Sequence, residues 1–168
     1  MPKILLDTKA VWGLIVRNSV YADHVYELAK EYELILPLPA IVEVIMAIYK
    51  IFSNQGENIE NGLEAVIQAI DKLRHILKNQ IEYGIRVRIL IPDYATIFEA
   101  VDLIKKYREV FVKIGPKKTK WLRIFDAIIA AIWIKRKVIL LADDLVFERI
   151  SQKYDLEYIK LEKRSSKL

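Results

Sequence analysis

Cysteine is absent from this chain of 168 residues, and histidine occurs only twice. Without a thiol there is no disulfide, no thiolate metal site and no cysteine nucleophile. Zinc sites are built largely from cysteine and histidine. His24 and His75 both lie in helical stretches where we expect ordinary exposed or half-buried side chains, so a zinc centre is not expected.

Long uncharged apolar runs are also missing. No such run reaches the roughly 18 residues of a membrane-spanning helix, and Asp7 interrupts the first apolar stretch too early for a signal peptide. The chain has no Walker loop, no G-x-G-x-x-G and no G-x-S-x-G motif, so nucleoside triphosphate binding, dinucleotide binding and serine hydrolysis lack their sequence signatures. We expect a cytoplasmic protein without membrane contact.

What the chain does have is apolar content and positive charge. Hydrophobic residues make up 54% of it, and no linker, repeat or low-complexity segment divides it. We expect a single domain over residues 1–161, followed by a charged, flexible tail over residues 162–168. The formal net charge of +5 is suited to a polyanionic partner, although the same charge also serves solubility alone.

Short apolar segments alternate with amphipathic helical segments along the whole chain. The strand-like segments are 3–7, 33–38, 87–92, 138–142 and a weaker one at 156–161. The main helical patterns between and after them cover 8–18, 23–32, 40–52, 59–83, 94–110, 124–137 and 144–154. This alternation predicts an α/β fold with a parallel sheet of about five strands and helices on both faces.

Four acidic residues lie where strands end or helices begin. Asp7 ends the first strand and Asp144 follows the fourth, while Glu43 and Asp126 lie near the starts of two helices. Because sites in such sheets collect at the carboxyl ends of the strands, we expect these acids to share a cleft. For Asp126 or Asp144 alone, capping of a helix start is an equally good explanation.

Clustered carboxylates repel one another unless a cation is present, and hard oxygen ligands suit Mg²⁺ or Mn²⁺. On a basic protein this combination indicates phosphodiester hydrolysis, in which the metal activates water. We expect Asp7, Glu43, Asp126 and Asp144 to be the metal ligands and catalytic residues, directly or through water. Asp143 is either an additional ligand or a surface charge at the strand end.

Four motifs carry a family resemblance when taken in order. They are ILLDT (4–8), P-x-x-x-E (39–43), FDAIIAA (125–131) and LLADDLVF (140–147). Over nearly the whole chain they resemble the PIN-domain ribonucleases, in particular the toxins of VapBC-type toxin–antitoxin pairs. The resemblance places the family's acids on the same four residues. It implies a PIN-like fold and a Mg²⁺- or Mn²⁺-dependent endoribonuclease, with an RNA substrate, a small antitoxin partner and a homodimer.

Three positions depart from the family pattern. Lys9 stands where the family usually has Asn or Ser, Ala142 replaces Thr or Ser, and Val146 replaces a second Asp. Lys9 would be able to pair with an acid and compete with the metal, and a lost hydroxyl would weaken the hydrogen bonds that orient the carboxylates. The alternative function is a catalytically degenerate PIN module that binds RNA or a protein without cleavage. A DNA-directed, flap-type nuclease ranks below both, because no added DNA-binding region is evident.

Basic residues precede Asp126 in the sequence. Lys117, Lys118, Lys120 and Arg123 are the candidate substrate-binding residues, since they would hold the phosphates that flank the cut. Trp121, which lies among them, either stacks on a base or packs into the core. The Tyr-rich stretch 21–32, together with the helix before it, offers either a groove for a partner helix or ordinary core packing.

Overall fold

The computed structural model describes residues 1–16, 18–114 and 120–164 of the chain. Its centre is a five-stranded sheet in the order β3-β2-β1-β6-β7, and every neighbouring pair in it is parallel. The strands are β1 (Lys3–Leu6), β2 (Glu33–Pro37), β3 (Arg86–Leu90), β6 (Ile139–Ala142) and β7 (Tyr158–Lys160). The predicted α/β class with a five-stranded parallel sheet is confirmed.

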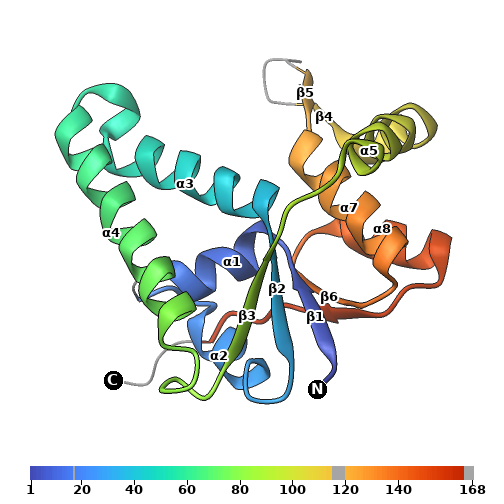
Figure 1. Ribbon diagram of the computed structural model, residues 1–168. Helices are drawn as coiled ribbons and strands as arrows, with labels where there is room; N and C mark the ends of the chain where they lie inside the picture. Colours follow the sequence, from blue (N-terminus) through green and yellow to red (C-terminus); the bar gives the residue numbers. More distant parts are fainter. Residues whose placement is uncertain (17, 115–119, 165–168) are drawn as a thin grey trace.

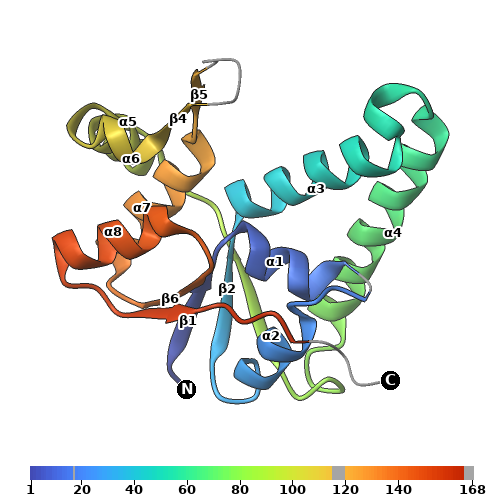
Figure 2. The ribbon, with the colours of Figure 1, turned by 180° about the vertical axis from the view of Figure 1, so that it is seen from behind.

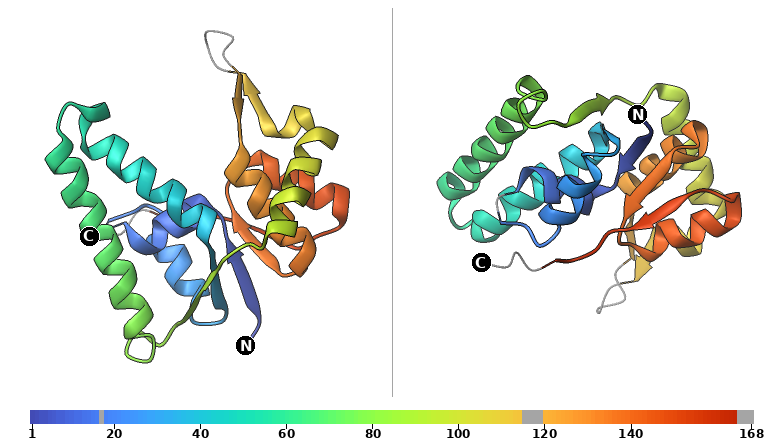
Figure 3. Two further views of the ribbon diagram at one scale, coloured as in Figure 1. Left: turned by 45° about the horizontal axis from the view of Figure 1, so that its top comes forward. Right: turned by 90° about the horizontal axis from the view of Figure 1, so that it is seen from below.

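Helices cover both faces of the sheet (Figures 1 and 3). On one face lie α1 (Thr8–Ile15), α2 (Ala22–Leu28), α3 (Leu38–Phe52), the short 3-10 helix η1 (Asn54–Gly56) and α4 (Ile59–Lys78). On the other lie α5 (Tyr94–Lys106), α6 (Arg108–Phe111), α7 (Ile124–Arg136) and α8 (Leu145–Tyr154). None of the described helices is long and apolar enough to cross a membrane.

Helix α7 is the element around which the second layer packs. It contacts α5, α6 and α8, and it also reaches across to α3. All seven residues from Ala127 to Trp133 are buried, which explains why this helix is apolar on every side instead of having one polar face. The indole N–H of Trp133 donates to the carbonyl of Val138 (2.8 Å), so α7 is tied directly to the start of β6. This packing holds Asp126, near the N-terminus of α7, in place.

Helices α3 and α4 form a hairpin that extends away from the sheet (Figures 1 and 2). Their close approach depends on Gly62. A Cβ atom at this position would lie 2.7 Å from the Cβ of Ser53 and 2.9 Å from the Cδ2 of Tyr49, which is closer than real carbon contacts allow. The glycine therefore lets α4 begin directly against the end of α3.

Several boundaries differ from those expected. Helix α3 begins two residues earlier than predicted, at Leu38, and α4 ends at Lys78 instead of continuing to residue 83. The predicted helix over residues 94–110 breaks at Tyr107 into α5 and α6, because Tyr107 has non-helical dihedral angles (φ −125°, ψ 52°). A small antiparallel hairpin, β4 (Val112–Ile114) and β5 (Lys120–Leu122), was not predicted.

The beginning of the predicted tail is bound to the domain. The backbone N–H of Glu162 donates to Nδ1 of His24 (2.9 Å), and that of Arg164 donates to the carbonyl of Val20 (2.8 Å). His24 is buried, so the expectation of an exposed or half-buried side chain was wrong for this residue, while His75 is exposed. Residues 165–168, the remainder of the predicted tail, lie outside the described residues.

Candidate metal centre

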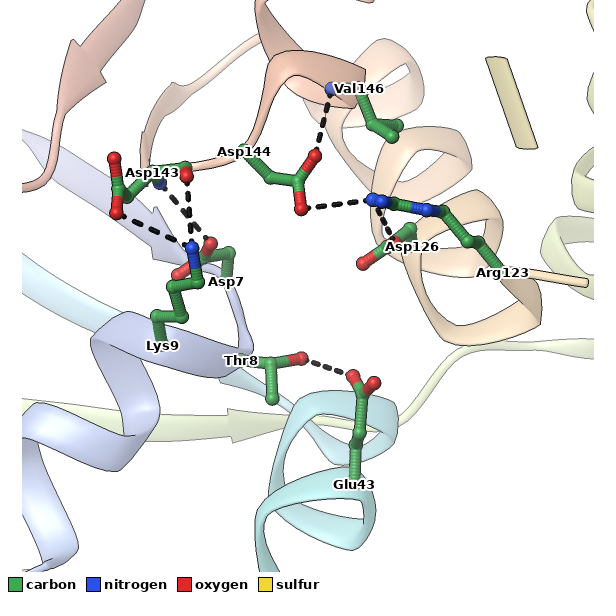
Figure 4. A network of polar contacts seen from close by, with 9 residues as sticks. All are labelled: Asp7, Thr8, Lys9, Glu43, Arg123, Asp126, Asp143, Asp144 and Val146. Atoms are coloured by element: carbon green, nitrogen blue, oxygen red, sulfur yellow. Dashed lines mark hydrogen bonds and ion pairs between the residues drawn. The ribbon is translucent and has the colours of Figure 1, made fainter. Parts of the chain in front are cut away.

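The five acidic residues singled out in the sequence face one edge of the sheet (Figure 4). Asp7 directly follows β1, and its backbone N–H donates to the carbonyl of Leu141 in β6 (3.0 Å). Asp143 and Asp144 directly follow β6. The other two acids come from helices α3 and α7. The carboxyl ends of the two central strands thus meet the beginnings of four helices.

Asp7 is a buried carboxylate that caps α1. Its side chain accepts hydrogen bonds from the backbone N–H groups of Ala10 (2.7 Å) and Asp143 (3.4 Å). Burial nevertheless raises the pKa of Asp7 to about 7, because the two hydrogen bonds offset only part of the lost hydration and the charge of Asp126 opposes ionisation. Asp7 is therefore a carboxylate that a nearby cation would help to ionise.

Asp126 lies in the first turn of α7. Burial raises the pKa of Asp126 to about 7, and the negative charges of Glu43 and Asp144 add to this effect. The guanidinium group of Arg123 lowers the pKa, but by less than these groups raise it. The electrostatic coupling shows that carboxylates far apart in the sequence interact at this edge.

Arg123 bridges two of the four predicted ligands. Its guanidinium group lies 2.9 Å from Oδ2 of Asp144 and 3.4 Å from Oδ2 of Asp126. The other oxygen of Asp144 accepts from the backbone N–H of Val146 (3.1 Å), so one carboxylate both caps α8 and takes part in the acidic cluster. Arg123 was predicted to bind substrate, whereas its side chain points inward, to the acids.

Thr8 holds Glu43, and sequence reasoning did not single it out. The hydroxyl group of Thr8 donates to a carboxylate oxygen of Glu43, which orients this acid from the neighbouring helix. The signal for Thr8 was its place directly after Asp7 within the ILLDT motif. Arg123 also had a signal, because it precedes Asp126 by three residues, a spacing at which helical side chains meet.

Lys9 pairs with an acid, but with none of the four predicted ligands. Its ammonium group donates to the backbone carbonyl of Asp143 (3.0 Å) and to the carboxylate of the same residue (3.3 Å). The carboxylate of Asp143 is thus paired with Lys9, and the two roles considered for Asp143, an additional metal ligand and a surface charge at the strand end, stay predictions. Two of the departures from the family pattern, Ala142 and Val146, are buried apolar side chains.

The remaining substrate-binding candidates lie apart from the acids. Lys117 and Lys118 fall outside the described residues, and Lys120 is exposed on β5. Trp121 on the same strand is 56% exposed, so the alternative in which it packs into the core was wrong. Because the backbone N–H of Arg123 donates to the carbonyl of Phe111 (2.8 Å), the base of this hairpin adjoins the start of α7.

A model of the PIN domain family matches residues 4–153 of the chain. The chain belongs to the PIN domain family. PIN domains are generally nucleases that use divalent metals. No curated protein matches this one in sequence.

Solved structures show the same fold at low sequence identity. A chain of VapBC2 from Rickettsia felis, bound to a DNA fragment from their promoter, is 18% identical with a TM-score of 0.58, covering 95% of this chain and 98% of that one. A chain of FitAB bound to the IR36 DNA fragment is 16% identical with a TM-score of 0.56 and covers 94% of each chain. A chain of VapBC-1 from nontypeable Haemophilus influenzae is 18% identical with a TM-score of 0.53, covering 94% and 97%.

The side chains of this PIN domain supply the ligand atoms that a divalent metal prefers. Their present positions, however, do not form a complete metal site. The acids supply hard oxygen donors, and two of them have pKa values raised by burial and by like charge. However, no three His, Asp or Glu side chains among the described residues are grouped closely enough to hold an ion as they stand. Arg123 supplies the positive charge between Asp126 and Asp144 instead. Binding of a metal therefore requires these side chains to rearrange around it.

Proposed function

We propose that this PIN domain is a Mg²⁺- or Mn²⁺-dependent endoribonuclease and the toxin of a toxin–antitoxin pair, acting in the cytoplasm. The observation that carries the proposal is the group of carboxylates at the carboxyl edge of the sheet, in which Asp7 and Asp126 both have a pKa of about 7. A cation in this group would relieve both the desolvation and the mutual repulsion. We assign Asp7, Glu43, Asp126 and Asp144 as the residues that would hold it.

A bound divalent ion would supply an activated water molecule and stabilise the charge that develops on the phosphate. The protein contributes by holding the carboxylates in place. Two backbone N–H groups fix the carboxylate of Asp7, and Thr8 fixes that of Glu43. The rigid packing of α7 does the same for Asp126. A metal held by Asp126 and Asp144 would take the place of their contacts with Arg123, whose guanidinium group would then be able to meet a phosphate oxygen.

RNA is the proposed substrate because of the charge and surface around this edge. The chain carries a net charge of +5, and the exposed hairpin beside α7 presents Lys113, Lys120 and Trp121. Lysine side chains bind the backbone of a single strand, and an exposed indole stacks on an unpaired base. Lys120 and Trp121 are therefore retained as substrate-binding residues in this proposal, and Arg123 would become one if a bound metal displaced it from the carboxylates.

An antitoxin is the proposed protein partner. The solved structures named VapBC and FitAB, which share this fold, support a partner of that kind. The surface supports it through a hollow of about 980 Å³ between α1, α3 and α4, with Ile15, Ile48 and Phe52 in its lining. The predicted groove over residues 21–32 is less suitable, because its tyrosines pack against the core. Tyr26, for example, donates to the carbonyl of Leu14 (3.3 Å).

Thermal unfolding with and without millimolar Mn²⁺ tests the metal site. A ligand at about 100 times its Kd stabilises the native state by about 2.7 kcal/mol, which raises the melting temperature of a chain of this size by several degrees. We expect this rise for the wild type and its loss in Asp126→Asn, together with loss of RNA cleavage. The control is Asp102→Asn, which removes an exposed carboxylate on α5 whose ion pair is with Lys105. Cleavage retained by Asp126→Asn would contradict the proposal.

The second candidate function is a module that binds RNA or a protein without cutting it. Lys9 and Arg123 favour it, because two fixed cations already neutralise part of the acidic cluster. Such a module would show no rise in melting temperature with Mn²⁺ and no cleavage, but it would still bind RNA in a fluorescence anisotropy assay. RNA cleavage that depends on Mn²⁺ and on Asp126 excludes it.

A further inference from the structure

Lys9 has a partly exposed ammonium group at the acidic edge. An ammonium group has three N–H donors, and within the described part of the chain Lys9 uses its ammonium for the two contacts with Asp143. The Lys9 side chain is 44% exposed, so its charged end is accessible from the solvent. The ammonium group of Lys9 is therefore held in place by Asp143 and still has an N–H group with which to donate a hydrogen bond to a ligand.

Asp143 fixes Lys9 relative to Asp7. The backbone N–H of Asp143 donates to the Asp7 carboxylate (3.4 Å), and its carbonyl and carboxylate receive the ammonium group of Lys9. Lys9 also lies in the first turn of α1, the helix that Asp7 caps. The three residues therefore form one network, shown in Figure 4, and the ammonium group is held beside the buried acid.

Arg123, the other cation at this edge, has a different environment. Its guanidinium group bridges Asp126 and Asp144, and its side chain is 22% exposed, half the value for Lys9. Arg123 thus neutralises the cluster from within. Lys9 lies at the rim and leaves the four predicted metal ligands unpaired with it, so it is the cation better placed to meet an incoming ligand.

We propose that Lys9 is a substrate-binding residue whose ammonium group, positioned by Asp143, binds a non-bridging phosphate oxygen of the RNA beside the acidic cluster. This inference rests on the proposed nuclease function. A phosphodiester that approaches several carboxylates is repelled, and a lysine at the rim offsets that repulsion as a compact point charge. This proposal reverses the expectation from the sequence, in which the positive charge of Lys9 competes with the metal for an acid.

The test is RNA affinity in the non-cleaving background of Asp126→Asn. A fluorescein-labelled single-stranded RNA is titrated with the Asp126→Asn protein, and binding is followed by fluorescence anisotropy. The titration is repeated with three double variants, in which Lys9→Gln, Lys9→Arg or Asp143→Asn is combined with Asp126→Asn. We expect Lys9→Gln to weaken binding about tenfold, as for the loss of one charged hydrogen bond. Its slope of log affinity against log salt should be smaller by about 0.7, the value for one phosphate contact on a single strand. Lys9→Arg should retain the affinity, and Asp143→Asn should lie between.

The matched control is Lys78→Gln, which removes the same charge from the exposed last turn of α4. If Lys9→Gln changes the affinity no more than Lys78→Gln does, the inference is overturned, and the Lys9–Asp143 pair is structural only. A second contradicting result is tighter Mn²⁺ binding by Lys9→Gln in the Asp126 wild type, with unchanged RNA affinity, since that would make Lys9 a metal competitor.

Failure of this inference is distinguishable from failure of the proposed function. If the wild type cleaves RNA and Lys9→Gln binds it normally, the nuclease stands and the role of Lys9 is wrong. If the Asp126→Asn background binds no RNA and the wild type cleaves none, both are wrong. Thermal unfolding of each variant without metal checks that the substitutions leave the fold intact.

Discussion

Arg123 and Asp126 lie three residues apart at the start of α7, and the pair shows how one charge can control another. Arg123 lowers the pKa of Asp126, yet burial and the neighbouring carboxylates still hold that pKa at about 7. The guanidinium group is also close to Asp144 (2.9 Å). A metal that binds both carboxylates has to replace this contact.

Arg123→Gln should therefore bind Mn²⁺ several-fold more tightly than the wild type, because the competing cation is gone. The same substitution should lower the melting temperature of the metal-free protein, since Asp126 and Asp144 lose their positive neighbour. Isothermal titration calorimetry measures the first effect and thermal unfolding the second. Lys120→Gln, which removes an exposed charge three residues away, serves as control. Weaker Mn²⁺ binding by Arg123→Gln would instead mean that Arg123 orients the carboxylates for the metal.

The raised pKa values of Asp7 and Asp126 predict a pH dependence. Both are about 7 in the folded protein, against an ordinary value of 3.8, so the folded state holds more protons than the unfolded state between these values. The contribution of these groups to the stability of the metal-free protein is therefore present at low pH and is lost as the pH rises through about 7.

Metal binding requires the ionised carboxylates, so it releases protons and strengthens over the same range. The rise in melting temperature caused by Mn²⁺ should consequently be larger at about pH 8 than at about pH 6. A rise that does not change with pH would show that neither acid binds the metal.

At the residue scale, the sequence places the acids but not their partners. The alternation of strands and helices is enough to put Asp7 and Asp144 at the same sheet edge, because parallel strands end together. Which cation meets which carboxylate depends on rotamers and on the packing of α1 against β6. Lys9 and Asp143 are 134 residues apart in the sequence, so no local pattern signals their contact. The burial of His24 likewise depends on a distant segment, the backbone at Glu162.

Among the elements, the strands that alternate with helices were predictable, including the three-residue β7, whereas the small hairpin of β4 and β5 was not. The two central strands are buried runs bounded by charge or helix starts, and α7 is a long apolar helix, so their patterns are strong. Strands β4 and β5 have three residues each, too few for a period to be recognised. The break at Tyr107 has no proline or glycine to mark it. Local context overrode helix propensity there.

The hairpin of α3 and α4 offers an element-scale prediction. Gly62→Ala should destabilise the protein by about 1–3 kcal/mol, the usual cost of inserting a methyl group into a packed contact. The new Cβ would meet Ser53 and Tyr49, and the two helices would have to separate. Chemical denaturation measures the loss. Asn61→Ala, at the neighbouring exposed position, is the control and should change the stability little. If Gly62→Ala had the same free energy of unfolding as the wild type, α3 and α4 would be less closely packed than described.

For the molecule as a whole, an apolar strip on α5 bears on the homodimer that the family resemblance implies. Tyr94, Phe98 and Val101 lie along one side of this helix, and the first two rings are in edge contact, with centroids 6.5 Å apart. Contiguous apolar surface of this kind marks association sites more often than scattered residues do. Phe98 is 66% exposed in the single chain, so a substitution there should leave the fold intact.

Phe98→Asp should therefore shift the protein from dimer to monomer in sedimentation velocity, with an unchanged melting profile at low concentration. The control is Ile81→Asp, which makes a similar change at an apolar residue that is 97% exposed in the turn between α4 and β3. Equal sedimentation of Phe98→Asp and the wild type would exclude this strip as the interface.

The strand order has one more consequence, for the time during synthesis. Strand β1 is central and pairs with both β2 and β6. The sheet is therefore complete only when residues 139–141 have been synthesised and have paired with residues 4–6. Contacts this distant in sequence form late in folding. The predicted metal ligands also lie far apart in the sequence, the first at Asp7 and the last at Asp144. A growing chain that has not yet reached Asp144 would lack one of the four predicted metal ligands, so under the proposed function it would be unable to cleave RNA until that residue had been added and β6 had paired with β1.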